Sequence, residues 1–351
     1  MRKNILTKSV VAASTMALAL TALCGCGASK PKLHLYNWVD YIDPVIAKEF
    51  EKQFNCKLVT DTFNSNESMF AKLKAGASGY DIVFPSSYMV PHLRDQGFIQ
   101  ELDISRLPNL ANIDHTYDRI VADPSFHISV PYMISNAGIA YNTKRCPDFE
   151  PTWKMFGNAK YAHSCTLLDD MRETIGAALK TLGYSLNTTD EAEVAAASDL
   201  VIEWVKNIAK FDSEFYRHSI ASGHFVFVHG YNGDLRQAID ENSDIAYALP
   251  KEGVSIACDE MVIPKTAKNP DLAYAFINFV HAPEIAARNM EYNYSLCPNS
   301  ACYGHLSEKV KSDSSIFIPD EIMAKSEAIR DLGEKNAIYV KAWNRIKAAA
   351  Q

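Results

Sequence analysis

The sequence lacks the motifs that mark the common classes of enzyme. A nucleophile elbow (G-x-S-x-G), a zinc-protease helix (H-E-x-x-H), a phosphate-binding loop and a dinucleotide fingerprint (G-x-G-x-x-G) are all missing from its 351 residues. Basic charge is also in short supply, because 35 Lys and Arg face 42 Asp and Glu, for a formal net charge of −7. Binding to nucleic acid requires a basic surface, so this balance argues against a nucleic-acid partner.

Long apolar runs are equally scarce, and the main one stands at the start of the chain. Arg2, Lys3 and Lys8 precede an apolar run of 15 residues at 9–23, which is short for a membrane span of about 20 residues. A positive segment followed by a short apolar run is typical of a secretory signal peptide. We therefore predict a signal peptide over residues 1–25, and its removal takes the formal net charge from −7 to −10.

The end of this run resembles the lipobox of bacterial lipoproteins, in which a leucine and two small residues precede the lipid-bearing cysteine. Cys26 fits this pattern better than Cys24, because Leu23 then stands at position −3 and Gly25 at position −1. The resemblance predicts lipidation of Cys26, a periplasmic or otherwise extracytoplasmic location, and attachment to a membrane through the lipid. An ordinary signal peptide with two incidental cysteines is the alternative.

Cysteine is otherwise sparse, and no C-x-x-C pair occurs. The six remaining cysteines are at positions 56, 146, 165, 258, 297 and 302. Export makes disulfides possible, but the irregular spacing is at least as consistent with buried free thiols. Two of the ten histidines, His224 and His229, are five residues apart, so on a strand they would point to opposite faces. We expect no metal site and no cofactor.

Strand and helix patterns alternate along the chain. Residues 33–38, 57–63 and 81–84 indicate strands, and helical patterns follow the first two, over about 44–54 and 67–75. Further expected elements are strands at 166–168, 225–228, 245–249 and 261–264, and helices that begin near Asp170, Thr189 and Asn269. In the helix that follows Asp170, we expect Ile175, Leu179 and Leu182 to share one face.

The three β-α repeats over the first of these elements predict a parallel sheet with helices on both faces. At roughly 150 residues per domain, the length suggests two domains. Two α/β blocks without a flexible linker fit a hinged two-lobe binding protein, and they also fit many enzymes.

Aromatic residues and carboxylates gather near the predicted strand ends, where ligands of such sheets bind. The aromatic residues are Trp38, Tyr41, Tyr88 and Tyr231, and the carboxylates are Asp40, Asp170, Glu173 and Asp259. Ring faces attract ammonium groups, and carboxylates accept charge-assisted hydrogen bonds, so this mixture suits an organic cation. Sugar-binding clefts use the same residue types. Asp170 and Glu173 also fit a capping box, Trp38 fits core packing, and Asp40 and Tyr41 fit a solvated turn.

A series of segments resembles the spermidine/putrescine-binding proteins of bacterial polyamine ABC importers. In chain order they are residues 35–41 (LYNWVDY), 65–74 (SNESMFAKLK), 80–88 (YDIVFPSSY), 168–173 (LDDMRE), 182–190 (LGYSLNTTD), 250–253 (PKEG), 263–269 (IPKTAKN) and 298–299 (PN). The likeness runs from about Leu33 to Lys347, which is nearly the whole chain after the predicted signal peptide.

The resemblance implies the α/β fold of a type II periplasmic binding protein, with two lobes, a hinge and a ligand cleft between them. The expected lobes are residues 26–135 plus 260–304 and residues 136–259 plus 305–351. The family's aromatic box carries over to Trp38, Tyr41, Tyr88 and Tyr294, with Tyr231 where the family often has Trp. Its amine-binding carboxylates carry over to Asp170, Glu173 and Asp259, and its polar contacts to Ser86 and Ser213.

Three positions depart from the pattern of the spermidine-preferring members. Ala257 replaces a Trp, Ile329 replaces a Gln, and Val39 replaces a Thr. The loss of one ring and two hydrogen-bonding groups should weaken the hold on a third ammonium group. We therefore expect putrescine to bind at least as tightly as spermidine.

The function implied by the resemblance is that of a lipid-anchored receptor, which captures polyamines outside the cytoplasmic membrane and delivers them to an ABC permease. No bond would be made or broken, so we do not expect an enzyme. The alternatives are a receptor of the same fold for a sugar or iron, an exported enzyme that uses Asp170 and Glu173 as a carboxylate pair, and a polyamine sensor without a role in transport.

Overall fold

The computed structural model describes residues 30–63 and 65–350, and all of its helices and strands belong to one unit, Pro31–Gln351. The predicted signal peptide and Cys26 lie outside the described residues. Within the described part of the chain, no helix has both the length and the apolar character that crossing a membrane requires.

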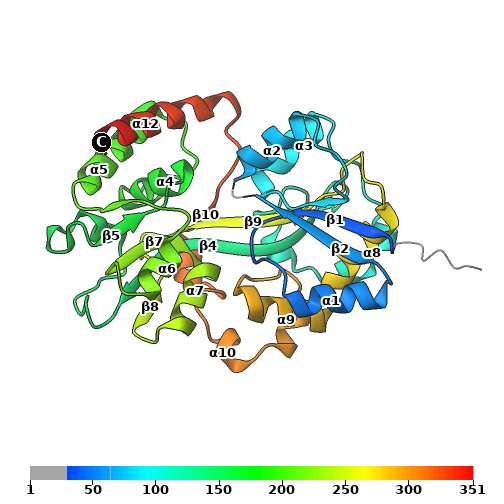
Figure 1. Ribbon diagram of the computed structural model, residues 1–351. Helices are drawn as coiled ribbons and strands as arrows, with labels where there is room; N and C mark the ends of the chain where they lie inside the picture. Colours follow the sequence, from blue (N-terminus) through cyan, green and yellow to red (C-terminus); the bar gives the residue numbers. More distant parts are fainter. Residues whose placement is uncertain (1–29, 64, 351) are drawn as a thin grey trace, which may run out of the picture. The chain divides into compact units, whose positions relative to one another are not determined.

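The first sheet has three parallel strands in the order β2-β1-β3 (Figure 1). They are β1 (Lys32–Asn37), β2 (Lys57–Thr62) and β3 (Ile82–Val83). The helices of this part of the chain are α1 (Pro44–Gln53), α2 (Asn66–Lys74) and α3 (Val90–Asp95). Because the strands are parallel, the residues that follow β1 and β3 meet at one edge of the sheet.

The second sheet has seven strands in the order β10-β9-β4-β7-β5-β6, with β8 also paired to β4. They are β4 (Val130–Asn142), β5 (Cys165–Leu167), β6 (Lys210–Phe211), β7 (Phe227–Tyr231), β8 (Ile245–Ala248), β9 (Ser255–Met261) and β10 (Glu327–Ala328). The long strand β4 pairs antiparallel with β9 through its first half and with β7 and β8 through its second half.

Nine further helices complete the described chain. They are α4 (Met171–Thr181), α5 (Glu191–Val205), α6 (Tyr216–Ala221), α7 (Asn232–Glu241), α8 (Pro270–Val280), α9 (Pro283–Asn293), α10 (Glu308–Lys311), α11 (Asp320–Met323) and α12 (Asn336–Ala349). The helices α4, α5 and α12 pack on one another, and α6 packs on α7.

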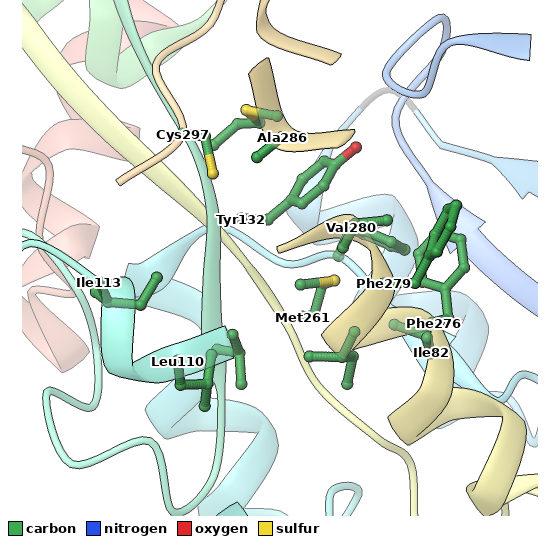
Figure 2. Packing of buried hydrophobic residues seen from close by; sticks show 14 of the residues in the cluster. Ile82, Leu110, Ile113, Tyr132, Met261, Phe276, Phe279, Val280, Ala286 and Cys297 are labelled. Carbon is green, nitrogen blue, oxygen red and sulfur yellow. The ribbon is translucent and has the colours of Figure 1, made fainter. Parts of the chain in front are cut away.

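Two large hydrophobic clusters lie on either side of the middle of β4. The first contains residues of β1, α1, α8 and α9, including Phe50 and Phe276, and Figure 2 shows part of it around Met261. The second contains residues of β5, α4, α5, β7 and α12. β4 contributes Ile134 to the first cluster and Ile139 to the second, so the chain passes from one to the other within this strand.

Most local expectations are confirmed, and four need correction. Asp190, not Thr189, caps α5, because its carboxylate accepts the backbone N–H groups of Ala192 and Glu193. Leu182 lies just beyond α4 and is 40% exposed, so it does not share the buried face. The strand expected at 225–228 is β7, which runs through His229 to Tyr231, and the strand expected at 261–264 is β9, which ends at Met261.

The packing of residues 306–316 also differs from the expected lobe bounds. Leu306, Val310 and Ile316 belong to the first hydrophobic cluster, although the sequence assigned them to the second lobe. Their apolar side chains follow α9 and pack beside it. Of the two alternatives left open for the cysteines, the structure has buried free thiols at positions 146, 165, 258, 297 and 302, and Cys56 is buried as well.

Candidate functional site

Every second side chain of the strand β9 lies on the same face. Side chains alternate along a strand, so Ser255, Ala257 and Asp259 point to the same side. Ser255 and Asp259 are four residues apart, which corresponds to about 13 Å along an extended strand. Each of these two polar residues lies at the centre of a separate cluster of candidate residues.

The first cluster surrounds the Asp259 carboxylate, which is only 7% exposed. The Tyr41 hydroxyl donates to its Oδ2 over 2.8 Å, and the Ser86 hydroxyl donates to its Oδ1 over 2.6 Å. Burial raises the pKa of Asp259 to about 6, and hydrogen bonding by Ser86, Tyr41 and Trp38 opposes this rise. Asp259 is thus a largely buried carboxylate with hydroxyl donors and no cationic side chain bonded to it within the described chain.

Trp38 lies beside this cluster and is half-buried. Its ring centroid is 4.4 Å from that of Phe63, so one side of the indole packs on the core. Its indole N–H is buried and has no hydrogen-bond partner of normal geometry among the described residues. Trp38 therefore combines the core packing weighed from the sequence with an indole donor near Asp259.

The second cluster is organised by the first turn of α4. Asp170 caps this helix, because its Oδ1 accepts the backbone N–H groups of Arg172 over 2.8 Å and Glu173 over 2.9 Å. The Glu173 side chain does not return a bond to the cap. Its Oε2 instead accepts a hydrogen bond from the Ser255 hydroxyl of β9. Asp170 therefore caps the helix as in a capping box, whereas the Glu173 carboxylate bonds β9 and not the cap.

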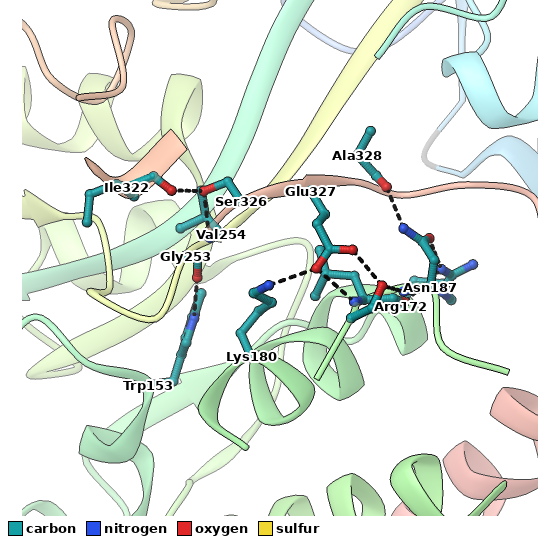
Figure 3. Close-up of polar contacts among 12 residues, drawn as sticks. Trp153, Arg172, Lys180, Asn187, Gly253, Val254, Ile322, Ser326, Glu327 and Ala328 are labelled. Carbon is teal, nitrogen blue, oxygen red and sulfur yellow. Dashed lines mark hydrogen bonds and ion pairs between the residues drawn. The ribbon is translucent and has the colours of Figure 1, made fainter. Parts of the chain in front are cut away.

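The charges of Asp170 and Glu173 are poorly compensated. Burial, with Asp170 next to it, raises the pKa of Glu173 to about 8. Burial also raises the pKa of Asp170, to which the charge of Glu67 on α2 contributes. The nearby Arg172 guanidinium donates instead to the side chain of Asn187 (Figure 3). It also donates to the backbone oxygens of Leu186 and Arg330. A buried carboxyl group and a half-buried one thus lie together, and neither forms an ion pair with a described residue.

Two tyrosines flank this second cluster. Burial raises the pKa of Tyr231 well above its usual value, and the charges of Asp170 and Glu173 add to the effect. Burial does the same for Tyr88, with Glu67 and Asp170 contributing. The two phenol groups therefore lie near the carboxylates, Tyr88 from the segment after β3 and Tyr231 from the end of β7.

Three predicted residues form no hydrogen bond with the described residues of either cluster. Asp40 is exposed, in a left-handed conformation with φ of 51°, and its charge acts on Asp234 of α7. Ser213 is exposed. Tyr294 donates its hydroxyl hydrogen to Asp240 of α7, and its ring lies 5.4 Å from the guanidinium of Arg236. Its side chain is thereby engaged by α7 and not by Asp259.

The structure adds two residues that sequence reasoning missed. Asn66 at the start of α2 bonds both Ser86 and Tyr88, and Ser255 bonds Glu173. Asn66 lies inside a segment that carries the family resemblance, so a signal was present for it. Ser255 had none, because β9 was not recognised over residues 255–260.

The described residues contain no group of three or more His, Cys, Asp or Glu side chains that could hold a metal ion. Two cavities, of about 360 and 300 Å³, lie elsewhere, one lined by Lys32, Tyr80 and Lys268 and the other by Leu73, Leu93 and Phe98. Neither is lined by a residue of the two clusters.

Two β-sheets covered by helices, with carboxylate and aromatic clusters along β9, are consistent with a solute-binding protein. Residues 45–317 match the family of bacterial extracellular solute-binding proteins, and the chain belongs to that family. It is 33% identical to a spermidine/putrescine-binding periplasmic protein of Salmonella typhimurium, over 97% of this chain and 98% of the relative.

Solved structures give the same picture. The TpPotD lipoprotein of Treponema pallidum is 36% identical, with a TM-score of 0.81 over 90% of this chain and 99% of that one. The spermidine/putrescine ABC transporter substrate-binding protein PotD of Streptococcus pneumoniae is 32% identical, with a TM-score of 0.82 over 92% and 100% of the two chains. The predicted fold class is thereby confirmed.

Proposed function

We propose that this chain is an extracytoplasmic receptor that captures polyamines and delivers them to the permease of an ABC importer. The observation that carries the proposal is the pair of carboxylate clusters, in which Asp259 at one end and Asp170 with Glu173 at the other have no cationic partner among the described residues. Burying carboxylates without partners is costly, and a ligand with an ammonium group at each end would compensate both clusters. The names of the relatives support this ligand class.

The spacing of the clusters favours a short diamine. Putrescine has five bonds between its nitrogens, which at about 1.2 Å per extended bond gives roughly 6 Å. With about 2.8 Å from each ammonium to its carboxylate, the assembly measures about 12 Å. This length is close to the backbone span of about 13 Å between Asp259 and Ser255, the residue whose hydroxyl bonds Glu173. Ala257 lies between them on the same face and would contact the methylene chain.

The three departures from the family pattern support the same preference. Ala257 offers no ring, Ile329 offers no side-chain hydrogen bond, and Val39 is 62% exposed. A third ammonium group would therefore gain little from these positions. We propose that putrescine binds at least as tightly as spermidine.

The proposed clamp consists of two lobes that meet near the middle of β4. In β9, Val254 just before the strand belongs to the second hydrophobic cluster and Ile256 to the first, and we therefore place the second crossing between the proposed lobes at Ser255. We place the third crossing between Ala328 and Leu332, because these residues pack against the first and the second cluster respectively. A ligand that contacts both lobes can shift the equilibrium toward closure, whereas a ligand that contacts one lobe cannot.

Attachment to a membrane through lipid on Cys26 belongs to the same proposal. It rests on the sequence Leu23-Cys24-Gly25-Cys26 and the preceding signal-like run. A receptor tethered in this way would stay close to its permease after export.

Calorimetric titration of the chain from Ser29 onward tests the ligand class. We expect putrescine and spermidine to bind, and sugars and amino acids to give no heat. Asp259→Asn should lower the affinity for putrescine by about 2–5 kcal/mol, because one buried ammonium group would lose its counter-charge.

Asp271→Asn is the matched control for this titration, since Asp271 is an exposed residue of α8 whose side chain is 92% accessible. Its affinity should equal that of the wild type. Heat from a sugar with none from either polyamine would replace the proposal by a sugar receptor of the same fold. An Asp259→Asn affinity within threefold of the wild type would remove Asp259 from the site.

A further inference from the structure

Asn66 is a buried amide at the centre of the candidate site. It is the first residue of α2 and only 4% exposed. The preceding residue, Ser65, caps the helix by accepting the backbone N–H of Ser68. The Asn66 side chain is therefore not needed as a cap.

All of the polar atoms of the Asn66 side chain are directed at the segment after β3. Its Nδ2 donates to the Ser86 hydroxyl over 3.0 Å and to the Tyr88 hydroxyl over 3.0 Å. Its Oδ1 accepts the backbone N–H of Ser86 over 3.0 Å. One amide thus holds the backbone and the side chain of Ser86 and also the phenol of Tyr88.

We propose that Asn66 is a positioning residue for ligand binding, which acts on Asp259 through the Ser86 hydroxyl and orients the Tyr88 hydroxyl at the other cluster. This inference rests on the proposed function, since it assumes that Asp259 binds an ammonium group. The hydrogen bonds of the Asn66 side chain go to Ser86 and Tyr88, and none joins it directly to Asp259.

The direction of each hydrogen bond follows from the donors available. The Asn66 NH₂ group can only donate, so the Ser86 oxygen accepts from it and turns its own hydrogen toward Asp259 Oδ1, 2.6 Å away. Donation to a carboxylate in a buried place is among the stronger hydrogen bonds of a protein. Asn66 therefore stabilises the ionised form of Asp259, the form that a cationic ligand requires.

The same reasoning applies to Tyr88. Its oxygen accepts from Asn66, so its O–H points away from that amide, and the described acceptor in reach is Glu67 Oε1 at 3.4 Å. This long contact leaves the Tyr88 O–H available to a ligand near Asp170. One side chain of α2 thereby sets donor directions at both clusters.

The groups that face Asp259 from neighbouring elements allow its titration to be followed. They are Trp38, Tyr41, Ser86 and Tyr132, and Cys258 of β9 itself also feels the charge of Asp259. The pKa values of Tyr41, Tyr132 and Cys258 are all raised by burial, so these three groups stay neutral near pH 6. Glu260, the next residue of β9, is turned to the opposite face, where it binds Ser87, Ser129 and the N–H of Ala122.

The test is the pKa of Asp259 in the ligand-free chain, read from carboxyl ¹³C resonances between pH 4 and 8 and assigned with Asp259→Asn. Ser86→Ala removes the donor itself, and we expect it to raise this pKa by about one unit. Asn66→Ala should raise it by about half a unit, because Ser86 remains but is no longer held. The Asn66→Ala/Ser86→Ala double variant should match Ser86→Ala alone, since Asn66 would act through Ser86.

Putrescine titration of the same variants completes the test. Asn66→Ala should weaken binding at least tenfold, and Asn299→Ala, which removes an equally buried amide bonded to the His281 carbonyl, should leave the affinity and the Asp259 pKa as in the wild type. An Asp259 pKa in Asn66→Ala within 0.2 units of the wild type (a shift of less than ~0.3 kcal/mol), or an additive double variant, would overturn the positioning role. A wild type that binds no polyamine would instead overturn the proposed function, while the pKa comparison would still stand.

Discussion

At the scale of single residues, the site is built at the expense of the stability of the ligand-free chain. Glu173 shows this most clearly, because its carboxyl is 6% exposed and its pKa is raised to about 8, first by burial and then by Asp170. A pKa raised in the folded state means that the stability is fully present below the unfolded pKa of about 4.5 and is lost as pH rises through about 8.

The variant Glu173→Gln tests this cost. At pH 8 the Glu173 carboxyl is ionised in the unfolded chain, and folding must either protonate it or bury its charge. A neutral amide avoids this cost and can still accept the hydrogen bond from Ser255, so we expect the ligand-free variant to be more stable than the wild type by about 2–4 kcal/mol at pH 8. At pH 4.5 the two proteins should differ by much less. Urea unfolding at the two pH values measures the difference, and Glu191→Gln on the exposed start of α5 is the control.

The same variant should lose affinity for putrescine, because the ammonium group at that end loses its counter-charge. Gain of stability with loss of binding is the signature of a residue retained for function. An equal stability gap at pH 4.5 and pH 8 would contradict this explanation.

At the scale of elements, the start of α4 combines a structural and a functional role in one side chain. Asp170 caps the helix through Oδ1, whereas its second oxygen receives no hydrogen bond from the described residues. Asn is as good a cap as Asp, so Asp170→Asn should keep the helix start and remove the charge. Asp170→Ala should remove both and be less stable than Asp170→Asn by about 1 kcal/mol.

Thermal unfolding and putrescine titration of this pair separate the two roles. Both variants should bind putrescine at least tenfold more weakly than the wild type, and only Asp170→Ala should unfold earlier. Wild-type affinity in Asp170→Asn would show that Asp170 is a cap alone.

Elements with local signals could be predicted from the sequence. Asp43-Pro44 predicted the start of α1, and the apolar run at 81–84 predicted the strand that contains β3. The strand β9 was missed over most of its length, because Ser255, Asp259 and Glu260 interrupt its apolar pattern. These polar residues are buried only because partners far along the chain satisfy them, and no local pattern contains that information.

Prediction of the candidate site from the sequence was limited in the same way, by contacts between distant residues. Asp170 and Glu173 are neighbours in sequence, so their juxtaposition was visible, and the family resemblance supplied Asp259. The contact between Tyr41 and Asp259 joins residues 218 positions apart, and that between Ser86 and Asp259 joins residues 173 apart. The position of Tyr294 depends on α7, which supplies Asp240 and Arg236 and engages its side chain.

At the scale of the whole molecule, the middle of β4 is also the place where buried amides tie separate segments together. Asn136 of β4 and Asn232 of α7 both donate to the carbonyl of Ser315, and Asn232 also donates to the carbonyl of Tyr294. Asn232 is fully buried and Asn136 is 4% exposed. The backbone carbonyls of two distant segments, at Tyr294 and Ser315, are thereby satisfied where the chain passes between the two hydrophobic clusters.

Buried histidines and buried carboxyl groups change the stability of the whole molecule in opposite directions as the pH changes. Burial lowers the pKa of His229 to about 3 and that of His281 to about 4, so both stay neutral in the folded chain at pH 5. A pKa lowered in the folded state means that stability is fully present above the unfolded pKa of about 6.5 and is lost as pH falls toward the folded value. Glu173 and Asp259 act in the opposite direction over the same range.

His229→Phe isolates the histidine contribution, because the carboxylates are the same in variant and wild type. His229 is fully buried with its ring 4.8 Å from that of Trp153, and neither ring nitrogen has a hydrogen-bond partner in the described chain, so an aromatic replacement keeps the packing. Between pH 7 and pH 5 the wild type should lose about 2 kcal/mol more stability than the variant in urea unfolding. The exposed His224, replaced by Gln, is the control, and equal losses in His229→Phe and the wild type would show that His229 takes up a proton in the folded chain without penalty.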